Sequence, residues 1–216
     1  MKQLVRKELS FTSLKLSYFF ILFGFMTMIP GYPILIGAFF LTLGIFQSFE
    51  NARLQNDIIY SLLLPAAKRD IVKAKYIYVL IVEGSYFVLA SILTAIRMVF
   101  LSNSQIYAQN VMMNANLAYL GYILIIFALF NIIFVNGFFK TAYYVGKPFL
   151  LYGLASFAAV FIAEAIHHFP GMNFLNSQSE GLDVQSAVLL CSIALFAASS
   201  FLAAKKSAKA FEELDI

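Results

Sequence analysis

The chain has 216 residues, of which 62% are hydrophobic and 12% are charged, and its formal net charge is +4. A soluble domain carries about 25% charged residues, so this composition excludes a protein that covers its whole surface with water-facing groups. We expect an all-α membrane protein with six transmembrane helices, because a span needs about 20 residues and six spans with short loops use the whole chain.

The first nine residues predict a short N-terminal helix that lies on the membrane surface. The apolar residues of this segment share one helical face: Met1, Leu4, Val5 and Leu9. The basic residues lie elsewhere on the helix, where they would meet anionic lipid headgroups. A basic flank that merely orients the first span is the alternative interpretation.

Polar breaks divide the apolar sequence into six predicted spans. The spans cover about residues 14–29, 34–49, 76–101, 117–139, 149–166 and 186–204. The breaks include a Pro-Gly turn at 30–33 and polar loops at 102–116 and 167–185. No tandem repeat or low-complexity linker interrupts the sequence, so we expect one membrane domain over residues 1–216.

The basic residues predict how the chain is oriented. With both termini in the cytoplasm, fourteen of the fifteen Lys and Arg residues fall in segments on the cytoplasmic side. Cytoplasmic loops of membrane proteins retain Lys and Arg, so this segregation supports an even number of spans. The fifteenth, Arg97, is expected to reach the outer interface from the third span. The positive charge therefore reports topology, and no nucleic-acid partner is expected.

Residues 50–76 predict a cytoplasmic helix and corner between the second and third spans. Apolar residues recur there at helical spacing: Ile58, Ile59, Leu62 and Leu63. Arg53 and Asp57 interrupt this pattern, and Pro65 must end or bend the helix because it lacks an amide donor. Lys68 and Arg69 then precede the third span. A short amphipathic helix of this kind is typical of a docking element for a soluble partner.

Two groups of ionisable residues fall within or beside the spans. Glu83, about two turns into the third span, is expected either to line a translocation pathway or to accept hydrogen bonds from a neighbouring helix. Arg97 lies about 21 Å farther along the same helix, too far to pair with it. Glu164, His167 and His168 share the outer end of the fifth span, where we expect a cap or loop anchor rather than a metal site.

Residues 62–76 resemble the cytoplasmic loop of bacterial ABC type-2 exporter permeases. In that family a pattern close to Leu-Pro-x-x-Arg-x-x-Ile-Val-x-x-Lys-Tyr lies between the second and third of six spans. The matching residues are Leu64, Pro65, Ile71, Val72, Lys75 and Tyr76. Lys68 stands where the family more often has Arg, and Arg69 follows it. The opening run with Lys2, Lys7, Glu8 and Leu9 also resembles the start of the family, and the chain is most similar to small peptide-exporter permeases of the phenol-soluble modulin exporter kind.

This resemblance implies the membrane subunit of an ATP-driven exporter in the bacterial cytoplasmic membrane. The subunit would form the pathway with a second permease subunit, as a homodimer or heterodimer, and would contact separate ATPase subunits that bind ATP and Mg²⁺. The implied coupling residues are Arg53, Asp57, Ile58, Ile59, Leu62, Leu63, Pro65, Lys68 and Arg69. A hydrophobic or amphipathic peptide is the expected substrate, because the spans are rich in Phe and aliphatic residues.

We expect no catalytic residue and no cofactor in this chain. Its one Gly-Lys pair, Gly146-Lys147, is followed by Pro148 and lies between spans, so it cannot form a phosphate-binding loop. An intramembrane metal-dependent peptidase using Glu164, His167 and His168 is one alternative function. A non-catalytic membrane scaffold or an ion-coupled carrier is another.

Overall fold

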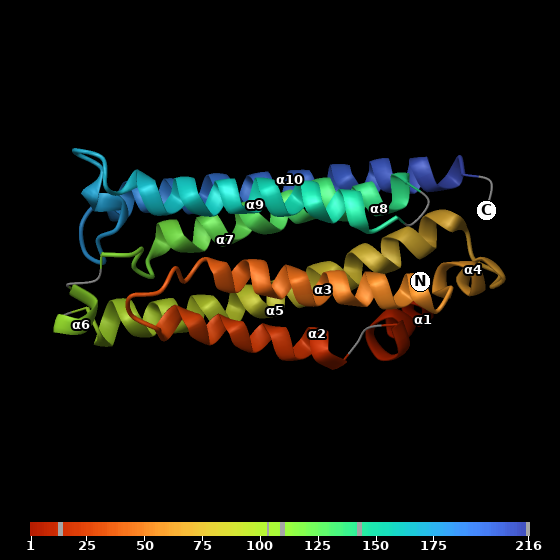
Figure 1. Ribbon diagram of the computed structural model, residues 1–216, viewed down its shortest axis with the longest axis horizontal. Helices are drawn as coiled ribbons and strands as arrows, with labels where there is room; N and C mark the ends of the chain where they lie inside the picture. Colours follow the sequence, from red (N-terminus) through yellow and green to blue (C-terminus); the bar gives the residue numbers. More distant parts are fainter. Residues whose placement is uncertain (13–14, 103, 109–110, 142–143, 215–216) are drawn as a thin grey trace.

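A computed structural model of the protein describes residues 1–216 except 13–14, 103, 109–110, 142–143 and 215–216. Every regular element in the described residues is a helix. The long helices run roughly antiparallel in an elongated bundle with two layers (Figure 1). The first layer comes from the N-terminal half of the chain and the second from the C-terminal half.

The first layer begins with α1 (Lys2–Lys7) and its π-helical continuation η1 (Glu8–Thr12). It continues with α2 (Lys15–Phe19), the 3₁₀ helix η2 (Phe20–Met28), α3 (Ile36–Leu54), α4 (Asp57–Leu62) and α5 (Lys68–Phe100). The second layer holds α7 (Leu117–Leu129), the π-helical η3 (Phe130–Val135), α8 (Asn136–Lys140), α9 (Gly146–Ile166) and α10 (Leu182–Glu212). The connections between long helices contain α6 (Gln105–Ala108) and η4 (Asn173–Leu175).

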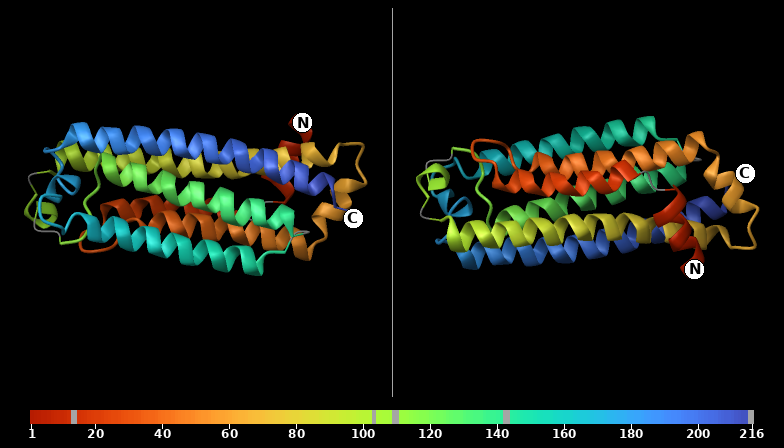
Figure 2. Two further views of the ribbon diagram at one scale, coloured as in Figure 1. Left: turned by 90° about the horizontal axis from the view of Figure 1, so that it is seen from above. Right: turned by 90° about the horizontal axis from the view of Figure 1, so that it is seen from below.

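The two ends of the bundle are built from different parts of the chain (Figures 1 and 2). We define the terminal end as the one that holds α1, α4 and the C-terminal part of α10. The loop end is the opposite one, where α6 and the connection between α9 and α10 lie. Because α5 has 33 residues, it extends about 50 Å and reaches past both faces of a hydrocarbon layer about 30 Å thick.

The chain is a multi-pass membrane protein. In the described residues four helical segments are long and apolar enough to cross a bilayer: Lys68–Phe100, Leu117–Lys140, Gly146–Ile166 and Leu182–Glu212. The segments Lys2–Ser10 and Lys15–Met28, bent by 84°, add a fifth if they count as one span. Helix α3, which contains most of the predicted second span at 34–49, is not among these segments, so six spans stay a prediction. Leu14, the predicted start of the first span, lies outside the described residues.

The segment Leu117–Lys140 is the centre of the bundle. Of its most apolar stretch 72% is buried by protein, against 39% in α5 and 22% in α9 and α10. An apolar helix that is covered on most sides belongs to a core, whereas the exposed apolar faces of α9 and α10 suit a lipid environment. Phe134 of η3 packs edge-on against Phe49 of α3 and Phe149 of α9, with ring centroids 5.2 and 5.7 Å apart.

Helix α3 approaches η2 closely through glycine. A Cβ atom on Gly37 would lie 2.9 Å from the backbone oxygen of Phe23, so a larger residue would force the helices apart. Ser17 of α2 donates a hydrogen bond of 2.5 Å to the carbonyl oxygen of Gly44. Small residues at such contacts are characteristic of packed membrane helices, because dispersion and short polar contacts hold them together there.

Candidate functional site

The connection between α3 and α5 forms a sharp corner at the terminal end. Asn56 precedes α4 with a φ of 53°, a left-handed conformation that Asn adopts more readily than most residues. Helix α4 then spans only six residues and ends before Pro65. Helix α5 begins at Lys68. A short helix, a proline corner and a basic start of the next long helix are all present, as the sequence predicted.

The apolar residues of α4 do not form one exposed face, which corrects the sequence interpretation. Ile58 is only 5% exposed and belongs to the core, and Leu62 is half-buried against it. Ile59 and Leu63 are 41% and 77% exposed. The helix is too short and too close to α3 and α5 to present four apolar side chains outward.

A different set of apolar residues lies on the surface around this corner. We call it the α4 patch, and it consists of Leu54, Ile59, Tyr60, Leu63 and Leu64, all exposed. Contiguous apolar groups on a surface typically mark contact with a protein partner or with lipid. The α4 patch is therefore the part of the predicted docking element that is available to a partner.

A chain of charged side chains supports α4 from inside the molecule. The Lys7 ammonium lies 2.7 Å from a carboxylate oxygen of Asp57 and 3.4 Å from Glu8, and the Lys75 ammonium lies 2.6 Å from Glu8. This ionic chain joins α1, η1, α4 and α5. Lys7 also donates to the hydroxyl of Ser61 in α4. Asp57, one of the implied coupling residues, therefore holds α4 to the N-terminal helix.

The inner pair of the ionic chain is almost fully enclosed. The side chains of Glu8 and Lys75 are each 4% exposed, whereas those of Lys7 and Asp57 are 23% and 17% exposed. Removing one partner of a buried pair costs about 3–5 kcal/mol, because it leaves an uncompensated charge. Sequence reasoning missed this pairing, although Lys7, Glu8 and Lys75 all lie in the segments that resemble the family pattern.

The other predicted coupling residues are spread over the terminal end. The Arg53 guanidinium lies 5.0 Å from the ring centroid of Tyr144. Lys68 donates a hydrogen bond of 2.5 Å to the backbone oxygen of Leu214, just beyond α10. Pro65 is exposed in the turn, and Arg69 is exposed near α10. These residues therefore contact several elements and do not surround a single cleft.

Glu83 lies fully buried where the two layers meet. One oxygen of its carboxyl group accepts a hydrogen bond of 3.0 Å from the amide of Asn131 in η3, and Asn131 also donates to Ser200 of α10. The other carboxyl oxygen and the amide oxygen of Asn131 are buried and have no hydrogen-bond partner in the described residues. Glu83 thus joins α5 to the second layer. One acceptor oxygen on each of Glu83 and Asn131 is left without a hydrogen bond in the described residues.

Arg97 lies at the loop end, the end of α5 where the sequence placed it, but the protein buries it fully, which corrects the expectation that it reaches the interface. Its guanidinium donates hydrogen bonds to the backbone oxygen of Thr27 at 2.6 Å and to the amide oxygen of Asn114 at 3.1 Å. It also lies over the ring of Tyr107, 4.2 Å from the centroid. Thr27, Asn114 and Tyr107 thus surround the Arg97 cation and replace its contacts with water.

Glu164 and the two histidines also lie at the loop end. A carboxylate oxygen of Glu164 accepts a hydrogen bond of 2.9 Å from the backbone of Met113. The rings of His167 and His168 are 4.1 Å apart, and burial lowers the pKa of His167. Among the described residues, no group of three or more His, Cys, Asp or Glu side chains is arranged to hold a metal ion. Glu164 and His167 thus contact the backbone of the loop at Met113 and Val111, as a loop anchor would.

The comparisons with known proteins give one match. A family model described as ABC-2 family transporter protein matches residues 3–207. No curated protein and no solved structure matches the chain. The matched range contains the ionic chain, the α4 patch, Glu83 and Arg97, so it covers all the sites described above.

Proposed function

This chain belongs to the ABC-2 transporter family, and we propose that it is the transmembrane subunit of an ATP-driven exporter in a bacterial cytoplasmic membrane. Membership implies a permease that associates with ABC ATPase subunits and does not itself hydrolyse ATP. In our proposal it forms the translocation pathway with a second permease subunit, identical or different. ATP and Mg²⁺ bind to the partner ATPases.

The α4 patch is the observation that supports the proposed coupling role. Its five apolar side chains are exposed at the end of the bundle that also carries the basic residues, and basic residues favour the cytoplasmic side. An ATPase bound to the α4 patch would push on a helix that the ionic chain connects to α1 and α5. Movement of the ATPase would therefore reach a membrane-crossing helix without passing through a flexible linker.

Single aspartate substitutions test this role. Apolar anchors of interfaces cost more than about 1 kcal/mol each on truncation, so a charge at such an anchor should strongly weaken binding. We expect Leu63→Asp and Ile59→Asp to reduce copurification of the co-expressed ATPase and to abolish export, at unchanged permease levels. Ile106→Asp is a matched control, because Ile106 is 65% exposed at the opposite end. Arg53→Ala should have a much smaller effect.

The outcome separates docking from simple membrane attachment. If α4 only rests on the inner leaflet, Leu63→Asp and Ile59→Asp will loosen the corner from the lipid without changing ATPase recovery. Full recovery of the ATPase with both variants would therefore remove the coupling role, whereas membership of the family would be unaffected.

The proposed substrate is a hydrophobic or amphipathic peptide, as for exporters of the phenol-soluble modulin kind. The support is the apolar lining of the helices and their few fixed charges. Amphipathic peptides should then stimulate the ATPase activity of the purified complex. Stimulation by sugars or ions, with none by such peptides, would contradict this substrate class.

Glu83 completes the proposal as a pathway residue that is covered in the present conformation. Its free carboxyl oxygen and that of the Asn131 amide lie where α5 meets the second layer, so separation of the layers would expose both. Glu83→Gln keeps the shape of the side chain and a carbonyl acceptor for Asn131. Loss of export in this variant, with unchanged stability, is expected; normal export would assign Glu83 a purely structural role.

A further inference from the structure

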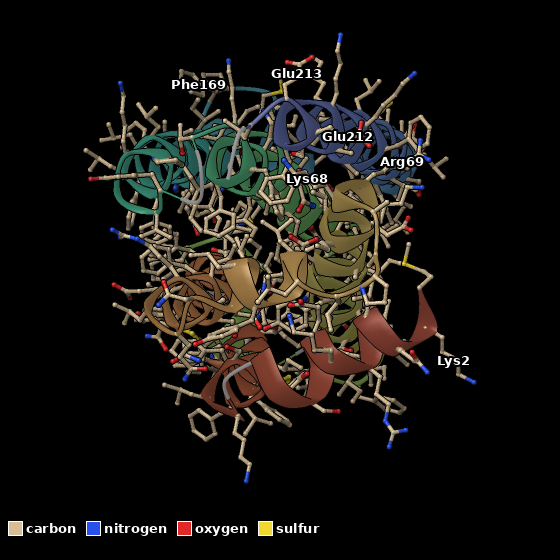
Figure 3. All side chains as sticks on the ribbon, turned by 90° about the vertical axis from the view of Figure 1, so that its right-hand side faces the viewer. Lys2, Lys68, Arg69, Phe169, Glu212 and Glu213 are labelled. Carbon is tan, nitrogen blue, oxygen red and sulfur yellow. The ribbon has the colours of Figure 1, made fainter. Side chains whose placement is uncertain are left out.

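A groove of about 440 Å³ lies between α5 and α10 at the terminal end, outside the α4 patch and the ionic chain. Four basic side chains line it: Arg69 and Lys73 from α5, and Lys205 and Lys209 from α10. Figure 3 looks onto this end and shows Arg69 beside Glu212, at the margin of the bundle. Glu212 is the only carboxylate in the lining, so the groove is strongly positive.

These cations are arranged unfavourably for the protein alone. Arg69 and Lys73 are four residues apart on one helix, and so are Lys205 and Lys209 on the other. Like charges at this spacing lie on the same helix face and repel one another. All four side chains are exposed, and none makes an ion pair with another described residue. A bound anion would remove this repulsion.

The groove also has an apolar part on its membrane side. Phe201 lies one turn from Lys205 towards the middle of α10 and is 70% exposed, and Ala208 forms part of the buried wall. Next to Arg69, Lys68 donates a hydrogen bond to the backbone oxygen of Leu214 and so joins the start of α5 to the segment after α10. A cluster of cations next to an exposed aromatic ring matches the two parts of a phospholipid, a charged headgroup and an acyl chain.

We propose that this groove binds an anionic phospholipid, whose phosphate lies among Arg69, Lys73, Lys205 and Lys209 and whose acyl chain runs along Phe201. Basic pockets between transmembrane helices bind acidic headgroups because several cations share one phosphate-bearing group. The lipid connects the start of α5 to the end of α10. Binding therefore fixes the helix that follows the α4 corner against the second layer of the bundle.

The proposal is tested with purified full-length chain in neutral detergent, titrated with phosphatidylglycerol or phosphatidylcholine. We expect phosphatidylglycerol alone to raise the unfolding temperature, and the bound lipid to be visible by native mass spectrometry. The variant R69Q/K73Q/K205Q/K209Q should need at least about tenfold more phosphatidylglycerol for half of the effect. The variant K205R/K209R keeps the charge and should behave as the wild type.

The matched control is K140Q/K147Q, which removes two exposed basic residues of the second layer outside the groove. It should bind phosphatidylglycerol normally. If K140Q/K147Q loses as much phosphatidylglycerol binding as the quadruple variant, the effect comes from overall charge and the proposed site is wrong. Normal phosphatidylglycerol binding by the quadruple variant would also overturn the site. Competition by soluble glycerol phosphate at the lipid's own concentration would assign the groove to free phosphate. If the quadruple variant loses ATPase copurification but still binds phosphatidylglycerol, the lipid proposal is wrong and the groove binds a protein partner.

Discussion

The terminal end and the loop end of the bundle are held together by different chemistry. At the terminal end, separate short elements meet through the ionic chain. At the loop end, amide side chains bind backbone oxygens: Asn116 donates to Leu175 at 2.8 Å and so connects the two long loops, and Gln185 donates to Phe174 at 2.7 Å and so holds the second loop on the start of α10. Hydrogen bonds from side-chain amides to backbone oxygens depend on short distances and defined angles, so they fix the loops in one arrangement. Charged groups attract over longer distances and can exchange partners. The terminal end should therefore respond to the removal of charges, and the loop end to the loss of hydrogen bonds from amide side chains.

The sharpest test of this comparison is Glu8→Ala. It leaves Lys75 buried and unpaired, so the free energy of unfolding should fall by about 3–5 kcal/mol, measured by denaturant titration in mixed micelles. The double variant Glu8→Leu/Lys75→Met should recover most of the loss, because it removes both charges. Glu50→Ala, at an exposed carboxylate of α3, is the control and should change the free energy by less than about 0.5 kcal/mol. If Glu8→Ala matches Glu50→Ala, the ionic chain does not hold the terminal end.

Arg97→Met should have the next largest effect. The variant loses hydrogen bonds to Thr27 and Asn114, but it removes a cation that has no carboxylate within ion-pair distance in the described residues. We expect a loss of about 1–3 kcal/mol in the same titration. Arg97→Lys keeps the charge and should lie between wild type and Arg97→Met. A loss larger than that of Glu8→Ala would reverse the comparison, since the loop end would then depend more on charge.

Asn116→Ala tests the hydrogen bonds that amide side chains make at the loop end. Asn116 caps α7 by accepting from the backbone of Tyr119 at 3.0 Å, and it donates to two loop carbonyl oxygens. We expect a loss of about 1–2 kcal/mol and faster hydrogen exchange in residues 113–118. Exchange in α1 serves as the internal control and should not change. Faster exchange at both ends would mean that they are not independent.

Of the four tests, raising the salt concentration should produce the smallest difference in stability between the terminal end and the loop end. Raising ionic strength from 0.1 M to 1 M shortens the screening length from about 10 Å to about 3 Å. The partly exposed pair of Lys7 and Asp57 should weaken by less than about 1 kcal/mol, visible as faster hydrogen exchange in α1 and α4. Exchange at the loop end should stay constant. An equal response at both ends would contradict the assignment of the ion pairs of the described residues to the terminal end.

The long helices could be predicted from the sequence to a large extent. The predicted spans at 76–101, 117–139, 149–166 and 186–204 fall within helices that can cross a bilayer, because a long apolar run dictates both helicity and membrane burial. The corner at Pro65 was predictable for the same kind of local reason. What these signals could not supply is the contact between segments that are distant in sequence.

The candidate site was less predictable. Apolar spacing identified α4, but it could not show that Ile58 packs inward while Leu63 is exposed, since that depends on where α3 and α5 lie. Glu8 lay in the predicted surface helix and Lys75 at the predicted start of the third span, and no local pattern pairs two residues so far apart. Arg97 was expected to face water because its partners, Thr27 and Tyr107, come from other turns and loops. The position of Asn131 in a π-helical turn has no periodic signal in sequence.

The pair of Glu8 and Lys75 also determines an order of assembly. The two residues are 67 positions apart, so the ribosome completes α1 and the following two predicted spans before Lys75 exists. Until then, the only ion-pair partner of the Glu8 carboxylate among the described residues is its neighbour Lys7, and α1 cannot yet dock against α5. The N-terminal segment is therefore synthesised first but docks only after the start of α5 has emerged, while the second layer is still to be made.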